Sequence, residues 1–152
     1  MHRLIASFFG SGLILRRFRG VDSGSGTVAA IIALPFSLWA GSTIGWQGQL
    51  LGAVVLTIAS FWSTRALVDE VGDAGWIVID EAAGVFFATI GLLGWPALVG
   101  FVVFRIADIT KRPFPGVAQA DRLPGPLGIV LDDTVAGLYG LAAGQLVRVA
   151  FF

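Results

Sequence analysis

The sequence predicts an all-α fold: a compact helical integral membrane protein with short transmembrane and re-entrant helices and an acidic site at the cytoplasmic face. Hydrophobic residues make up 56% of the chain, only 13% are charged, and the mean hydropathy of +0.85 lies outside the usual soluble range. Nine of the ten acidic residues nevertheless lie between Asp69 and Asp133. Ionisable residues among apolar membrane helices are rare and usually indicate a functional site. All 152 residues are expected to form one domain.

The N-terminal segment 4–15 is apolar and is followed by a basic cluster, Arg16, Arg17 and Arg19. No small-residue cleavage site follows it, so a cleaved signal peptide is not expected. Two interpretations of the cluster remain open. It fits a segment lying on an anionic membrane surface, and it also fits the ordinary positive flank of a membrane helix.

Two nearly uncharged stretches, 27–44 and 49–64, are separated by a Gly/Trp/Gln turn at 45–48 and predict a helical hairpin. Each arm is at the short end of the roughly 17 to 25 residues that cross a bilayer. Spanning helices and a partly submerged hairpin therefore both remain open. Pro35 is expected to kink the first arm.

The next apolar segment, 82–104, is interrupted around Gly94-Trp95-Pro96. If the chain made four simple crossings, the acidic pair Asp80-Glu81 would lie on one membrane face and the later acids on the other. We therefore predict that 82–104 bends back at Gly94-Trp95-Pro96 as a pair of short helices buried against protein. All the motif carboxylates would then share the cytoplasmic face.

The segment 105–128 is basic and rich in Pro and Gly, which excludes one long helix. The last helix is expected to begin near Asp132 and to run to the C-terminus. On it, Gly137, Gly140 and Gly144 recur at roughly helical spacing. Small residues let helices approach closely in membranes, so this face could pair two copies as a homodimer.

Each acidic pair has a small residue about one helical turn later: Gly84 follows Asp80-Glu81, and Gly137 follows Asp132-Asp133. Close helix approach there would bring the two pairs together. Clustered carboxylates repel each other unless a cation lies between them, and hard oxygen ligands favour Mg²⁺ over zinc. The alternative for Asp132-Asp133 is ordinary capping of a helix N-terminus.

A third motif spaces Arg105, Asp108 and Lys111 three residues apart, so all three could lie along one helix face. Arg offers a planar fork to phosphate oxygens, Lys offers a point charge, and Asp108 could hold a metal that bridges to the same phosphate. The alternative is an ion-pair ladder at the end of a membrane helix.

The composition also excludes several classes of function. The net charge is zero and the basic residues are scattered, so no nucleic-acid partner is expected. The chain has no cysteine, which rules out disulfides, thiolate metal sites and a cysteine nucleophile. Its one histidine, His2, lies at the terminus, so a histidine phosphoenzyme is not expected.

Taken together, these segments resemble the phosphatidylglycerophosphatase A family. The family pattern has a Gly-Thr start, Ile-Asp-Glu-x-x-Gly, Phe-Arg-x-x-Asp-x-x-Lys, and Gly-Ile-x-x-Asp-Asp-x-x-Ala-Gly. The blocks stand here as Gly26-Thr27, 79–84, 104–111 and 128–137, and Phe9-Gly10-Ser11-Gly12 is similar to the family's N-terminal Phe-Gly-x-Gly. The order and spacing of the blocks agree with the family, and so does the total length.

The resemblance implies an all-helical, Mg²⁺-dependent enzyme of the bacterial inner membrane. Such an enzyme removes the terminal phosphate of phosphatidylglycerophosphate at a cytoplasmic site, with membrane lipid around it. The implied catalytic residues are Asp80, Glu81, Asp108 and Asp133. The implied metal ligands are Asp80, Glu81, Asp108, Asp132 and Asp133. The implied substrate-binding residues are Arg105, Lys111, Arg112 and Thr27.

One departure from the family concerns the phosphate-binding lysine. The family's Lys-Pro-x-Pro is one residue longer here, as Lys111-Arg112-Pro113-Phe114-Pro115, so either Lys111 or Arg112 could stand at the lysine position. Two other functions remain as alternatives. One is a phosphatase or phosphotransferase for another lipid phosphate. The other is a small cation transporter subunit, which would place acids at helix centres, whereas most of these acids are expected at helix ends.

Overall fold

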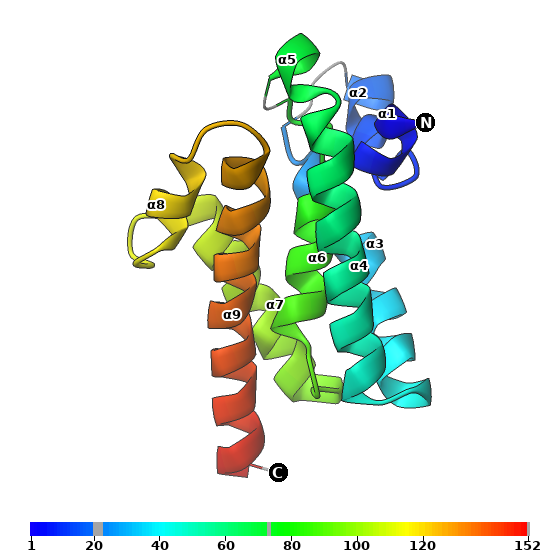
Figure 1. The fold of residues 1–152 in the computed structure, drawn as a ribbon. Helices are drawn as coiled ribbons and strands as arrows, with labels where there is room; N and C mark the ends of the chain where they lie inside the picture. Colours follow the sequence, from blue (N-terminus) through cyan, green and yellow to red (C-terminus); the bar gives the residue numbers. More distant parts are fainter. Residues whose placement is uncertain (20–22, 73, 152) are drawn as a thin grey trace.

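The computed structural model describes residues 1–19, 23–72 and 74–151, and within them every regular element is a helix (Figure 1). The predicted all-α class is confirmed. Five long helices form the body of the molecule: α3 Ser25–Thr43, α4 Trp46–Arg65, α6 Ile79–Ala88, α7 Gly94–Thr110 and α9 Pro126–Phe151. Three short helices precede them, α1 His2–Ala6, η1 Ser11–Leu13 and α2 Ile14–Arg19, and two more lie between long helices, α5 Val68–Val71 and α8 Val117–Asp121.

The long helices alternate in direction along the chain (Figure 1). Helices α6 and α9 begin, and α4 and α7 finish, at one end of the bundle, which we call the acidic end. The short helices α1, α2, α5 and α8 also lie there. The turns between α3 and α4 and between α6 and α7 lie at the opposite end, together with the C-terminus. The chain therefore returns to the acidic end after each reversal.

The predicted hairpin is confirmed as α3 and α4, which the two residues Ile44 and Gly45 connect. Gly45 has φ +84°, a left-handed conformation that glycine adopts without steric cost. Pro35 lies inside α3, which nevertheless continues to Thr43. By length and composition, α3 and α9 are each sufficient to cross a membrane.

The predicted reversal within 82–104 is confirmed, but it lies at 89–93, earlier than expected. The tripeptide Gly94-Trp95-Pro96 forms the first turn of α7 instead of the bend. Proline is tolerated there because the first N–H groups of a helix have no intrahelical partner. The reversal itself uses Gly91, whose φ is +69°. Because of this reversal, α6 begins at the acidic end and α7 finishes there.

A buried glutamine from the α3–α4 hairpin holds the reversal in place. The side chain of Gln49 is fully buried, and its Nε2 donates to the carbonyl of Leu92 at 3.2 Å. Its Oε1 accepts from the backbone N–H of Gly91 at 2.8 Å. Nearby, the hydroxyls of Ser37 and Thr89 lie 2.6 Å apart. Polar groups of a buried turn are thus paired, which an apolar interior requires.

The last helix begins six residues earlier than predicted, at Pro126. Proline is favoured as the first helical residue because its φ is already fixed near the helical value. Asp132 and Asp133 therefore lie in the second turn of α9, inside the helix. The capping interpretation of this pair is wrong, since neither residue is at a helix terminus.

The glycines of α9 pack against α6 and α7 of the same chain. A Cβ on Gly137 would lie 2.8 Å from the carbonyl of Gly84, and one on Gly140 only 2.4 Å from that of Gly100. Gly144 is buried in the same way. The face that suggested a homodimer is therefore occupied within the chain, and its effect is to bring three helices to backbone contact.

Large apolar side chains are exposed along the outer faces of α3, α4, α7 and α9. Examples are Ile31, Trp39, Leu51, Ile58, Val102, Ile106, Leu138 and Leu146. Apolar surface of this extent marks a contact with a membrane or another protein.

We predict that Gln49→Leu destabilises the fold, because it leaves the buried Leu92 carbonyl and Gly91 N–H without partners. Each unpaired group should cost roughly 1 to 3 kcal/mol. Thermal unfolding in detergent measures the effect. The matched control is Gln47→Leu, an exposed position on the same helix. Equal melting temperatures for the two variants would contradict this account of the reversal.

Candidate functional site

Three helices bring five carboxylates together at the acidic end. Asp80 and Glu81 lie in the first turn of α6, Asp108 in the last turn of α7, and Asp132 and Asp133 in the second turn of α9. They form two overlapping triads that share Asp133. The predicted convergence of the acidic motifs is confirmed, and it depends on the reversal between α6 and α7.

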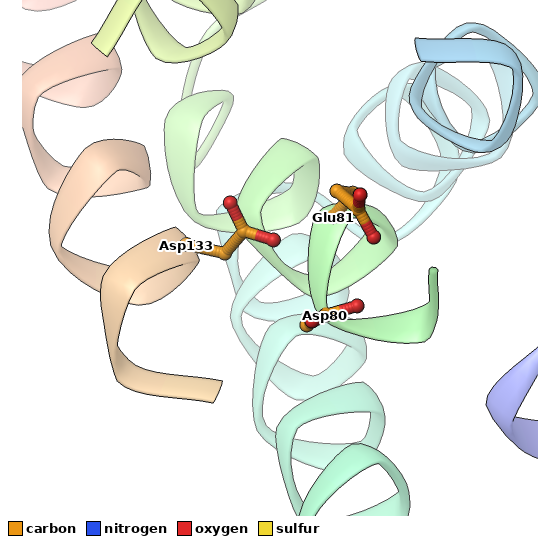
Figure 2. Close-up of side chains that lie close together, drawn as sticks. All are labelled: Asp80, Glu81 and Asp133. Carbon is orange, nitrogen blue, oxygen red and sulfur yellow. The ribbon is translucent and has the colours of Figure 1, made fainter. Parts of the chain in front are cut away.

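The first triad consists of Asp80, Glu81 and Asp133, and one oxygen of each lies within 4.8 Å of the others. Figure 2 shows the Asp133 carboxylate projecting from α9 toward the two acids of α6. Asp80 Oδ1, Glu81 Oε2 and Asp133 Oδ1 are buried and have no hydrogen-bond partner among the described residues. At that separation two ionised carboxylates repel by roughly 3 kcal/mol at an effective dielectric constant of about 20. Unpaired hard oxygens in this arrangement fit a divalent cation such as Mg²⁺.

The second triad consists of Asp108, Asp132 and Asp133, again within 4.8 Å of one another. Here two of the three carboxylates already have cationic partners. Asp108 Oδ2 lies 2.6 Å from Arg105 Nη1, and Asp132 Oδ2 lies 2.7 Å from Lys111 Nζ. The uncompensated negative charge is therefore concentrated at the first triad.

Arg105 is held at the site by Asp108 of its own helix and by Thr27 of α3. Its side chain is only 11% exposed, and its Nη2 donates to Thr27 Oγ1 at 3.1 Å. Thr27 comes from the first turns of α3, so the Gly26-Thr27 motif reaches the same site as the acidic motifs. In this structure Thr27 contacts the guanidinium, which a hydroxyl can orient by accepting one of its five N–H donors.

Lys111 does not share a helix face with Arg105 and Asp108, contrary to the prediction. It is the residue after α7 and has a left-handed backbone with φ +51°. This conformation takes its side chain away from the α7 face, and Nζ contacts Asp121 and Asp132. Arg112, the alternative at this position, is exposed, so Lys111 is the residue that reaches the carboxylates.

Gly26 and Asp121 also contact the site, although neither was among the predicted site residues. A Cβ on Gly26 would lie 1.9 Å from Glu81 Oε1, so a larger residue there would displace this carboxylate from its position beside α3. The Gly-Thr motif was the available signal for it. Asp121 lies at the end of α8 and pairs with Lys111 across the Pro-rich loop, a contact that no local pattern indicated.

The environment changes the protonation of the α6 acids. Burial raises the pKa of Glu81 from 4.5 to about 7. Burial, together with the neighbouring negative charge of Glu81, also raises the pKa of Asp80 well above its ordinary value. At Lys111, burial lowers the pKa, but the hydrogen bonds to Asp121 and Asp132 outweigh it and the pKa is raised. Without a cation, the first triad therefore retains protons near neutral pH.

Comparison with known proteins supports the same reading. The family model described as phosphatidylglycerophosphatase A matches residues 4–148. The chain belongs to the phosphatidylglycerophosphatase A family. Family membership makes it an enzyme, and the general activity is that of a lipid phosphatase.

Two proteins that are similar to this chain have different names. The "Phosphatidylglycerophosphatase A" of Haemophilus influenzae is 33% identical over 143 residues, covering 91% of this chain and 83% of the relative. The "Putative phosphatidylinositol-3-phosphatase" of Bacteroides thetaiotaomicron is 29% identical over 154 residues, covering 90% and 86%. No solved structure matches the chain.

The raised pKa values predict how stability depends on pH without metal. The folded state keeps protons on Asp80 and Glu81 that the unfolded chain has released, so the free energy of unfolding should fall as pH rises from about 4.5 to about 7. In EDTA, the melting temperature should be lower at pH 8 than at pH 5.5. Adding Mg²⁺ should raise it more at pH 8, since cation binding requires deprotonated ligands.

The control for this measurement is Glu81→Gln, which should weaken both the pH dependence and the response to Mg²⁺. A metal-free protein that is equally stable, or more stable, at pH 8 would contradict the assigned environment of the triad.

Proposed function

We propose that this chain is a Mg²⁺-dependent lipid phosphatase that hydrolyses phosphatidylglycerophosphate to phosphatidylglycerol and phosphate. The observation that carries the proposal is the set of buried, unpaired carboxylate oxygens on Asp80, Glu81 and Asp133 beside the cations Arg105 and Lys111. Family membership supports the reaction class.

The first triad is proposed to hold one Mg²⁺, with Asp133 shared with a second position at Asp108 and Asp132. When bound there, Mg²⁺ would polarise the phosphate and lower the pKa of a coordinated water. The carboxylates supply the hard oxygen ligands that this cation prefers. Because the cations Arg105 and Lys111 already compensate Asp108 and Asp132, the first position should bind more tightly.

Arg105 and Lys111 are proposed to bind the phosphate. Arg105 is positioned by Thr27 and Asp108, so its guanidinium is presented in a fixed orientation. A fixed donor set stabilises negative charge that develops on the transferring oxygens. Arg112 is exposed beside this site and could contact the lipid headgroup from the loop.

A first-triad carboxylate that is not bound to the metal is proposed as the general base, and Asp80 is the candidate. Burial and the neighbouring charge of Glu81 raise the pKa of its carboxyl above the ordinary value, which favours acceptance of a proton from water. The water oxygen forms a bond to phosphorus, the bond from phosphorus to the glycerol oxygen breaks, and that oxygen takes up a proton. The alternative is direct attack by the Asp80 carboxylate to form an acyl phosphate, which water then hydrolyses.

The acidic end is proposed to face the cytoplasm of a bacterial inner membrane. Among the described residues, Arg3, Arg17, Arg65 and Arg122 belong to elements at that end, and Arg148 is the sole Lys or Arg near the other. Cytoplasmic flanks of membrane helices carry this excess of positive charge. At the opposite end lie three exposed tryptophans, as is typical of a membrane interface: Trp39, Trp46 and Trp95.

A second candidate substrate is another membrane lipid with a terminal phosphate. The observation that favours it is the similarity to the Bacteroides thetaiotaomicron relative, whose name is "Putative phosphatidylinositol-3-phosphatase". The same ligands and cations would act on either phosphomonoester, so the headgroup contacts would decide the preference.

The test is phosphate release from phosphatidylglycerophosphate in detergent, with Mg²⁺ and with EDTA. We expect metal-dependent turnover that falls about 10²-fold or more in Asp133→Asn, because this substitution removes the ligand shared by both triads. The matched control is Asp69→Asn, an exposed acid on α5 that should retain activity.

Phosphatidylinositol 3-phosphate should be assayed in parallel. Faster turnover of this lipid would move the assignment to the second substrate. No turnover of either lipid by folded protein would contradict the proposed function.

A further inference from the structure

An apolar cavity of about 700 Å³ lies beside the α3–α4 hairpin, outside the carboxylate site. The N-terminal segment forms one wall with Phe8 and Phe9, and α3, α4 and α6 form the others, including Ile32, Val55 and Phe86. The described lining carries no charged side chain. Its size lies in the range of small-molecule sites, but its surface offers almost nothing to a polar ligand.

The N-terminal wall has an unusual backbone. Phe8 and Phe9 have φ values of +45° and +57°, and Gly10 follows with +90°. A left-handed conformation at two successive aromatic residues costs free energy and persists only where surrounding structure enforces it. The segment is packed closely against the rest of the chain at Gly12, where a Cβ would lie 2.3 Å from the carbonyl of Trp76. The Phe-Gly-x-Gly motif thus shapes the wall of the cavity.

Two helices that carry site residues also line this cavity. On α6, Phe86 follows Glu81 by five residues, and on α3, Ile32 follows Thr27 by five. Five residues correspond to a rise of about 7.5 Å along a helix. The cavity therefore lies between one and two helical turns further along the bundle than the acidic site, with Phe86 and Ile32 turned by about 140° around their helices from Glu81 and Thr27.

Resting on the proposed function, we propose that this cavity holds one acyl chain of the phospholipid whose phosphate occupies the carboxylate site. An acyl chain is the one part of that substrate that matches an uncharged, aromatic-lined space. Lipid tails are as apolar as such a pocket, so transfer from the bilayer adds little affinity. The cavity acts instead by orientation, since a fixed chain places the phosphate at the carboxylates.

The experiment fills the cavity with Val55→Trp and compares it with Val54→Trp. Both valines are exposed on α4, but only Val55 lines the cavity. With long-chain phosphatidylglycerophosphate, Val55→Trp should lower kcat/KM about tenfold, because the phosphate is then less well positioned. With a dihexanoyl analogue it should act like wild type. Val54→Trp should leave both substrates unchanged. An equal effect of the two variants, or an equal loss on both substrates, overturns the inference.

A second measurement does not depend on turnover. Phosphatidylglycerol carrying a diazirine in one acyl chain is crosslinked to wild type and to both variants, and the labelled peptides are identified. We expect labelling of the 8–14 segment and of α4 around Val55, lost in Val55→Trp and kept in Val54→Trp. Unchanged labelling in Val55→Trp overturns the inference.

The two measurements separate the inference from the proposed function. Specific labelling without any phosphatase activity would contradict the function and support the cavity. Phosphatase activity without specific labelling would support the proposed function and contradict the binding of an acyl chain in the cavity. If Val55→Trp lowers the melting temperature, Ile32→Trp on the opposite wall replaces it and carries the same expectations.

Discussion

The crowding of five carboxylates at one end of a helix bundle is the constraint on which the rest of the structure depends. Asp80, Glu81 and Asp133 lie close enough to repel by roughly 3 kcal/mol per ionised pair, and their buried oxygens have no partner among the described residues. An exposed salt bridge contributes about 1 kcal/mol at most, so a surface ion pair could not hold such a cluster together. The neighbouring cations Arg105 and Lys111 offset the negative charge of only Asp108 and Asp132. A divalent cation at the first triad, as proposed above, would make the arrangement of ionised carboxylates favourable.

Two features of the backbone make that crowding geometrically accessible. The reversal at 89–93, which Gln49 holds through the backbone of Gly91 and Leu92, returns α7 to the end where α6 begins. The glycines of α9 have no side chain that would hold α9 away from its neighbours, so the helices approach closely, as Gly140 does to Gly100. The enzyme is therefore a case in which close helix packing serves the chemistry of the site. In the proposed function, the apolar cavity along α3 and α6 would extend the same arrangement from the phosphate to an acyl chain.

Much of the fold and of the candidate site could be predicted from the sequence. Hydropathy and the Gly/Pro interruptions are local signals, and they predicted the hairpin, the reversal and the gathering of the acids. The start of α9 was missed because Pro126 at the first helical position competed with an acidic pair that also resembles a cap. The direction of Lys111 depends on one left-handed residue, and the partner of the α9 glycines depends on tertiary packing. Neither leaves a periodic signal. The placement of acids near helix ends agrees with the expectation that argued against a transporter.

The measurement that tests the central claim most directly is Mn²⁺ binding, followed by electron paramagnetic resonance in detergent. Mn²⁺ takes the same hard oxygen ligands as Mg²⁺ and reports binding without any assumption about substrate. The account predicts that wild type and Asp69→Asn bind it alike, and that Asp133→Asn binds it more weakly by about tenfold or more. Mg²⁺ should displace it. Equal Mn²⁺ affinity in wild type and Asp133→Asn would contradict the claim that these carboxylates are gathered around a cation.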